Sequence, residues 1–181
     1  VDFRYHQIVN IYTDANAYFL ERPWTRIERP NTRSPDGNIS SMMKDENWFE
    51  LVSGDRSRSG GQWDIWEATY SPAGADGYPK RIWDKKTGKI DKQVAAYWKE
   101  HFDLRAILER DWATLGPKLV GKIHIYVGDD DSYYLDDAVE LMEKFLESTR
   151  TPYYAGSVTY KRGAPHCYSP GAKELLDAMT Q

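Results

Sequence analysis

Three consecutive aspartates and one histidine have the side chains for acid–base chemistry. Asp129, Asp130 and Asp131 follow an apolar, β-rich stretch and precede a helical pattern, and His166 lies in the segment GAPHCYSP further along the chain. A carboxylate that accepts a hydrogen bond from one imidazole nitrogen fixes the tautomer of the ring, which leaves the other nitrogen to act as a general base. The residue types therefore predict an acid–base pair, provided that the fold brings the two segments together.

The flanking elements predict that these segments do meet. Lys122–Gly128 (KIHIYVG) and Ala155–Gly163 (AGSVTYKRG) are typical of strands, and the first is apolar enough to be buried on both faces. The helix expected between them carries an apolar stripe at Leu135, Val139, Met142 and Leu146. Strand, helix and strand predict a right-handed parallel βαβ unit. Functional groups gather beyond the carboxyl ends of parallel strands, so the Asp129–Asp131 turn and His166 should share one rim.

Further helices flank this unit. Asp91–His101 suits a helix, and Asp103 is a plausible N-cap of a second one, which Gly116 and Pro117 should end. The apolar face expected of that second helix consists of Leu104, Ile107, Leu108, Trp112 and Leu115. A last helix is expected to begin with Ser169 as N-cap and Pro170 at its first position.

The segment from residue 22 to residue 89 has a different character. It is rich in proline, glycine and serine and has few periodic apolar positions, which predicts long loops with short elements. Such loops inside a domain are often insertions that cover a site. Four arginines, at positions 22, 26, 29 and 33, alternate with prolines here and indicate a solvated loop.

The aspartates, and the cysteine next to His166, also have other conceivable roles. Asp131 or Ser132 could simply cap the helix that follows. A calcium loop starting at Asp129 is disfavoured, because Tyr134 falls where the sharp turn requires glycine. Cys167 follows His166 directly, which disfavours a cysteine nucleophile paired with that histidine and indicates a small buried side chain.

Composition excludes several classes of protein. The formal net charge of -4 and the pI of about 5.6 give no basic face for nucleic acid. No run of about 18 apolar residues predicts a membrane span, and a single cysteine excludes an internal disulfide. The sequence predicts no metal site and no cofactor, and it favours the cytoplasm without deciding the compartment.

Two long stretches resemble a known family. GGQWDIWEATYSPAGADGYPKRIWDKKTGKID and ERDWATLGPKLVGKIHIYVGDDDSYYLDDAVELMEKFLE resemble the C-terminal half of bacterial putative esterases of the α/β-hydrolase superfamily. The likeness extends from VDFRYHQIVNIYTDANAYF to the histidine loop. It implies that the catalytic acid lies in a GxxD turn, at Gly128 and Asp131, with Asp129 as the alternative. The base would be His166.

The resemblance also implies a partial α/β-hydrolase fold, in which residues 1–181 form the C-terminal portion of one domain. That portion would comprise the parallel βαβ unit, the last helix and residues 22–89 as an irregular insertion or cap. Family members carry their nucleophile in a GxSxG elbow, and no such motif occurs here, since Ser59 and Ser157 fail the spacing. The nucleophile is therefore expected in the missing N-terminal half of the same domain, and this chain alone should be poorly active.

The leading hypothesis is thus the acid–base half of a serine hydrolase that cleaves a small-molecule carboxylic ester. A peptidase or an acyltransferase could use the same residues. The alternative from another class is a non-catalytic module that binds a carbohydrate or a peptide. In either case the tryptophan-rich segment could line a pocket, with Gln62, Trp63, Asp64 and Trp66 as the candidate residues.

Overall fold

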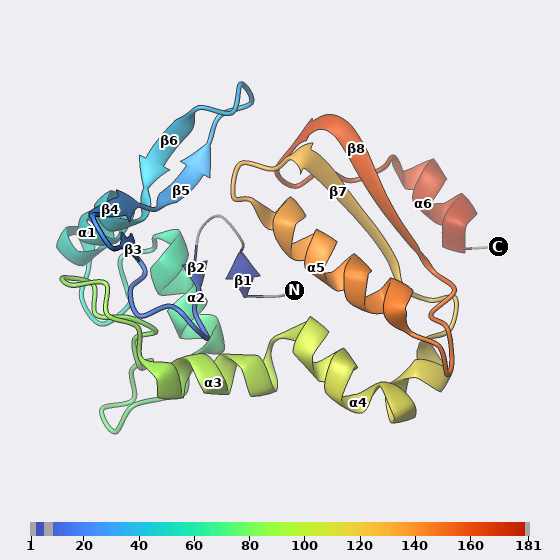
Figure 1. Ribbon diagram of the computed structural model, residues 1–181, viewed down its shortest axis with the longest axis horizontal. Coiled ribbons are helices and arrows are strands. Elements are labelled where there is room, and N and C mark those ends of the chain that lie inside the picture. The colour runs from blue at the N-terminus through green and yellow to red at the C-terminus, as the bar shows by residue number, and fades with distance from the viewer. Residues whose placement is uncertain (1–2, 6–8, 180–181) are drawn as a thin grey trace.

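The protein has a mixed α/β architecture of helices and several small two-stranded sheets (Figure 1). The computed structural model describes residues 3–5 and 9–179. Part of the stretch VDFRYHQIVNIYTDANAYF, which carries the family resemblance at the N-terminus, therefore lies outside the described residues. The strands are β1 Arg4–Tyr5, β2 Val9–Asn10, β3 Phe19–Arg22, β4 Thr25–Glu28, β5 Pro30–Arg33, β6 Ile39–Met42, β7 His124–Asp130 and β8 Ser157–Pro165. The helices are α1 Met43–Ser53, α2 Gln62–Tyr70, α3 Lys92–His101, α4 Leu104–Leu119, α5 Leu135–Ser148 and α6 Ala172–Met179.

The predicted βαβ unit is present. β7 and β8 pair in parallel, with His124 opposite Ser157 and Gly128 opposite Lys161, and α5 connects them. Side chains alternate across β7, so that Ile125 packs with the buried cluster of α4 and α5 whereas Tyr126 lies on the side of α6. Figure 1 shows the two strands side by side with α5 next to them.

The burial of β7 is lower than its apolar sequence predicts. Only Val127 and Gly128 are buried, while Ile125 and Tyr126 are half-buried and His124 is exposed. Within the described residues, β7 has β8 as its strand partner on one edge and no strand on the other. The expectation of a strand buried on both faces is therefore wrong for this chain as it stands.

The helix boundaries confirm the predicted N-cap at Asp103, show a further N-cap at Asp91, and correct two other expectations. Asp91 accepts hydrogen bonds from the backbone of Gln93 and Val94, and Asp103 accepts one from the backbone of Ala106. However, α4 does not end at Gly116 and Pro117 but continues to Leu119. The glycine at position 116 leaves room for the Trp112 ring, because a Cβ there would lie 2.8 Å from the indole.

The start of α6 differs from the expectation that Ser169 caps the last helix. The carbonyl of Gly171 accepts the hydrogen bond from the backbone of Leu175, so the helix begins after Pro170. Two large apolar side chains of α6, Leu176 and Met179, are exposed.

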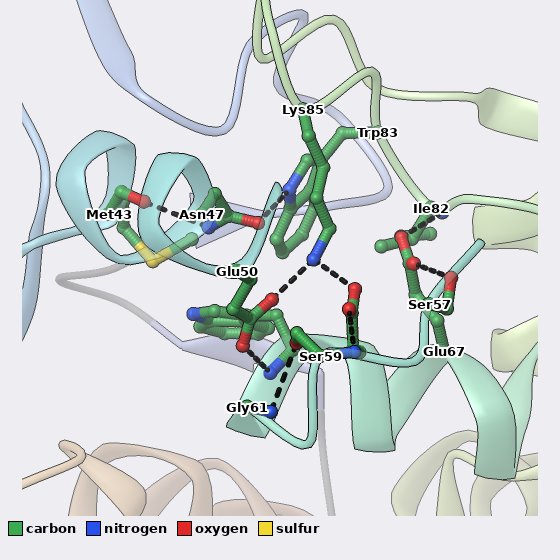
Figure 2. A network of polar contacts seen from close by, with 12 residues as sticks. Met43, Asn47, Glu50, Ser57, Ser59, Gly61, Glu67, Ile82, Trp83 and Lys85 are labelled. Atoms are coloured by element: carbon green, nitrogen blue, oxygen red, sulfur yellow. Dashed lines mark hydrogen bonds and ion pairs between the residues drawn. The ribbon is translucent and has the colours of Figure 1, made fainter. Parts of the chain in front are cut away.

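The irregular segment is more ordered than predicted, because it contains α1 and α2 in addition to short antiparallel strand pairs. These helices bury polar side chains, which is why they lack an apolar stripe. Lys85 forms ion pairs with both Glu50 of α1 and Asp64 of α2, and all three side chains are at most 2% exposed. Figure 2 shows Lys85 directed toward Glu50, with Asn47 bonded to the Trp83 indole nearby.

The arginines of this segment do not form a uniform solvated loop. Arg22 and Arg26 are exposed, but Arg29 is buried and forms an ion pair with Asp14 at 2.7 Å. Arg33 is mostly covered. The remaining core of this region is aromatic, with Phe3, Trp63 and Trp98 among its buried members.

Candidate active site

His166 and Asp131 are in direct contact. The Nδ1 atom of His166 lies 2.8 Å from Oδ2 of Asp131, and the imidazole extends from the turn after β8 toward the turn after β7. The Asp131 side chain is 5% exposed and that of His166 is 35% exposed. Because a carboxylate only accepts, the hydrogen lies on Nδ1, and within the described residues Nε2 has no protein hydrogen-bond partner. The pair thus has a buried orienting acid and an accessible imidazole nitrogen.

The turn holds Asp131 through its second carboxylate oxygen. Oδ1 accepts hydrogen bonds from the backbone of Tyr133 at 2.8 Å and of Leu135 at 3.3 Å. Tyr134, just before α5, has a left-handed backbone conformation with φ of 58°, which closes the turn. The N-cap position of α5 is Tyr134, without a side-chain cap, so the expectation that Asp131 or Ser132 caps this helix is wrong; Asp131 instead uses one oxygen for the turn and the other for the imidazole.

Glycine at position 128 permits the close approach of the two strand ends. A Cβ on Gly128 would lie 2.1 Å from the carbonyl oxygen of Ala164 and 2.7 Å from that of Pro165. Only a residue without a side chain fits at this position. The glycine therefore allows His166, the residue after Pro165, to lie next to the acidic turn. Cys167 has a φ of 62° and is exposed, so the expectation that it is buried is wrong.

The side chain of Asp129 has another partner. Oδ1 of Asp129 accepts a hydrogen bond from the backbone of Gly163 at 2.6 Å, which ties the end of β7 to β8. Asp131, and not Asp129, is the member of the triplet that contacts the imidazole.

A cavity of about 380 Å³ lies beside the pair. Its lining combines Asp131 and His166 with apolar side chains of β7 and α5, among them Ile125, Val127 and Met142. Apolar walls with a few convergent polar groups are typical of ligand pockets, and also of surfaces that another apolar segment covers.

Two residues near the pair were not identified from the sequence. The Tyr133 ring meets the His166 ring edge-on, with centroids 4.8 Å apart. Arg33 of β5 donates to the Asp131 carbonyl at 2.9 Å and forms an ion pair with Asp136 at 3.0 Å. Burial raises the pKa of Asp136 despite the opposing effect of this guanidinium. Arg33 lies almost a hundred positions away in the sequence, so no local pattern indicates the contact.

The four residues proposed for a substrate pocket lie elsewhere. Gln62, Trp63, Asp64 and Trp66 are on α2, and none of them lines the cavity beside His166. Trp63 is 5% exposed and donates its indole N–H to Asn31, while Asp64 is occupied by Lys85. Trp66 packs edge-on against Trp63. These contacts place Trp63, Asp64 and Trp66 in the structural core of the N-terminal region.

The described residues offer neither a metal site nor a membrane-spanning helix. Among residues 3–5 and 9–179, no cluster of three or more histidine, cysteine, aspartate or glutamate side chains could hold a metal ion. None of the helices that the structure describes is both long and apolar enough to cross a bilayer. In comparisons with known proteins, no family model, no curated protein and no solved structure matches this chain.

Proposed function

We propose that this chain supplies the acid and the base of a serine hydrolase that cleaves carboxylic esters. The observation that carries the proposal is the 2.8 Å contact between a buried aspartate and an accessible imidazole, located after two adjacent parallel strands. The acid precedes the histidine along the chain, and each of the two residues directly follows a strand. The α/β-hydrolase arrangement uses the same order. The resemblance of the sequence to bacterial putative esterases points the same way.

The chemistry assigned to the pair follows from its protonation. Asp131 keeps the hydrogen of His166 on Nδ1, so Nε2 accepts the proton of a serine hydroxyl as its oxygen attacks the ester carbonyl carbon. His166 then gives this proton to the departing alkoxide, and an alcohol and an acyl-enzyme result. In the second half, Nε2 takes a proton from water, the hydroxide displaces the serine, and the proton returns to the serine oxygen. The products are the carboxylic acid and the free enzyme.

The nucleophile is assigned to a segment upstream of Val1. Two features support this assignment: within the described residues β7 has one edge without a strand partner, where a further strand could pair, and its face beside the apolar cavity is incompletely covered, whereas parallel strands are normally covered on both faces. We infer that the missing part of the domain packs along β7 and brings a serine hydroxyl within hydrogen-bond reach of Nε2. It would complete the partial α/β-hydrolase fold that the sequence suggests.

The test compares this chain with a protein extended by the coding sequence upstream of Val1. Both are assayed for hydrolysis of short p-nitrophenyl esters and for labelling by a fluorophosphonate, which reacts with an activated serine. We expect turnover and one labelled serine in the extended protein, and neither in the 181-residue chain. An extended protein that folds but neither hydrolyses any of these esters nor takes up the label would overturn the proposal.

A further inference from the structure

The guanidinium of Arg33 lies across the turn that carries Asp131. Its Nε donates to the Asp131 carbonyl oxygen at 2.9 Å, and one terminal nitrogen reaches both carboxylate oxygens of Asp136 at 3.0 Å. The backbone N–H of Arg33 also donates to the carbonyl of Ser132 at 2.9 Å. Figure 1 shows β5, which ends in Arg33, beside the turn between β7 and α5. The turn is therefore fixed from outside the βαβ unit.

The packing around Arg33 makes this contact specific. The Arg33 and Asp136 side chains are 18% and 17% exposed, and the guanidinium lies over the Tyr134 ring at 4.8 Å. A planar guanidinium presents its donors in a fixed fork that can bond the carbonyl and the carboxylate while the plane stacks on the aromatic ring, a geometry that the single nitrogen of an ammonium group does not reproduce. Tyr134 is the left-handed residue that closes the turn, so Arg33 contacts each part of it.

Electrostatics explains why the turn needs a cation. Five aspartates lie close together in the sequence, at positions 129, 130, 131, 136 and 137. Like charges at this spacing repel one another. Arg33 neutralises part of this charge at Asp136 and leaves the side chain of Asp131 to His166.

The local backbone of β5 directs the side chain to this place. The pairing of β5 with β6 is irregular on both sides of Thr32, next to Arg33. Such bulges change the direction in which the following side chain points and often occur next to functional sites.

We propose that Arg33 is a positioning residue that holds the Asp131 carboxylate where it can bond Nδ1 of His166. This inference rests on the proposed function, in which Asp131 and His166 act as acid and base. Arg33 itself does not touch the imidazole; it acts through the Asp131 backbone and through Asp136.

The experiment measures the tautomer of His166 in the 181-residue chain by ¹⁵N NMR, at a pH where the imidazole is neutral. In the wild-type chain we expect the form with hydrogen on Nδ1 to dominate. In Arg33→Gln we expect the ratio of the Nδ1–H form to the Nε2–H form to fall about fivefold or more, as for a weakened charge-assisted hydrogen bond. Arg33→Lys, which keeps the charge but loses the fork geometry and the stacking on Tyr134, should give an intermediate ratio.

Arg26→Gln is the matched control, because Arg26 is exposed and pairs with Glu21 away from the turn. It should leave the tautomer ratio unchanged. A folded Arg33→Gln chain with the wild-type ratio would overturn the inference. If Arg33→Gln does not fold, Arg33→Lys and Asp136→Asn decide instead, and wild-type ratios in both would overturn it. The tautomer ratio is measured without any esterase activity. If His166 proves dispensable for turnover, the proposed function is refuted, but the effect of Arg33 on the tautomer ratio is not.

Discussion

Nδ1 of His166 and Oδ2 of Asp131 are 2.8 Å apart, although the two residues belong to different turns and follow different strands. The contact joins the end of β8 to the turn after β7. Since the Asp131 side chain is 5% exposed, water competes little for the hydrogen bond. The contact therefore depends on the acid itself and on the close approach of the two strand ends.

Asp131→Asn should remove the acceptor that fixes the imidazole tautomer. An amide can donate to Nδ1, which would place the hydrogen on Nε2 and block its action as a base. In the upstream-extended protein we expect kcat to fall about 10³- to 10⁴-fold. Asp129→Asn is the matched control, because Asp129 bonds Gly163 and not the imidazole. Equal losses in both variants would refute the assignment of the acid to Asp131.

Gly128→Ala should separate the ends of the two parallel strands. The added methyl group would overlap the Ala164 carbonyl oxygen, and overpacking of this kind destabilises a protein by about 1–3 kcal/mol. We expect a lower free energy of unfolding by chemical denaturation and a weaker Nδ1–H signal of His166. Gly171→Ala serves as the control, since nothing lies within 4 Å of its Cβ position. If both variants match the wild type, the close approach at Gly128 does not constrain the site.

Lys85→Met should strongly destabilise the N-terminal region. Removal of the ammonium group leaves the carboxylates of Glu50 and Asp64 buried without their cation, which costs about 3–5 kcal/mol. The measurement is the free energy of unfolding from urea titration. Lys86→Met, at the exposed neighbouring position, should stay within about 0.5 kcal/mol of the wild type. A Lys85→Met chain as stable as that control would contradict a structural role for the cluster.

Glu67 should make stability depend on pH. Burial raises its pKa from 4.5 to about 6, although Ser57 donates to the carboxylate and Lys85 lies nearby. The neutral carboxyl is the form that the fold favours. Its contribution, on the order of 2 kcal/mol, is complete below about pH 4.5 and is lost as the pH rises through about 6.

Glu67→Gln isolates this effect, because the amide can still accept from the backbone of Ile82 and donate to the Ser57 hydroxyl. The variant should match the wild type near pH 4 and exceed it in stability near pH 8, as measured by unfolding at several pH values. Glu174→Gln, at an exposed position, should show no such pH-dependent difference. A constant difference between Glu67→Gln and the wild type across the range would contradict the raised pKa.

The regular half of the chain could be predicted from the sequence because its signals are local. The stripe through Met142 and Leu146 indicates α5, and the aspartates at 91 and 103 indicate the starts of two helices. The contact between Asp131 and His166 followed from the general position of functional groups at the ends of parallel strands. Whether this pair serves a hydrolase stays a prediction.

The N-terminal region could not be predicted in the same way. The inward faces of α1 and α2 carry Asn47, Glu50, Asp64 and Glu67, so burial there follows charge pairing and not hydrophobic periodicity. Outward positions such as Phe49 and Val52 are apolar, which reverses the usual pattern. Arg33 illustrates the same limit, because its partners become neighbours only in the folded chain.

The most direct test of the acid–base assignment is the turnover of His166→Ala in the upstream-extended protein, with a short p-nitrophenyl ester as substrate. His124→Ala is the control, because His124 lies at the opposite end of β7. We predict that His166→Ala lowers kcat/KM at least about 10³-fold while His124→Ala retains activity. A His166→Ala protein that hydrolyses the ester within about tenfold of the wild-type rate would contradict the account.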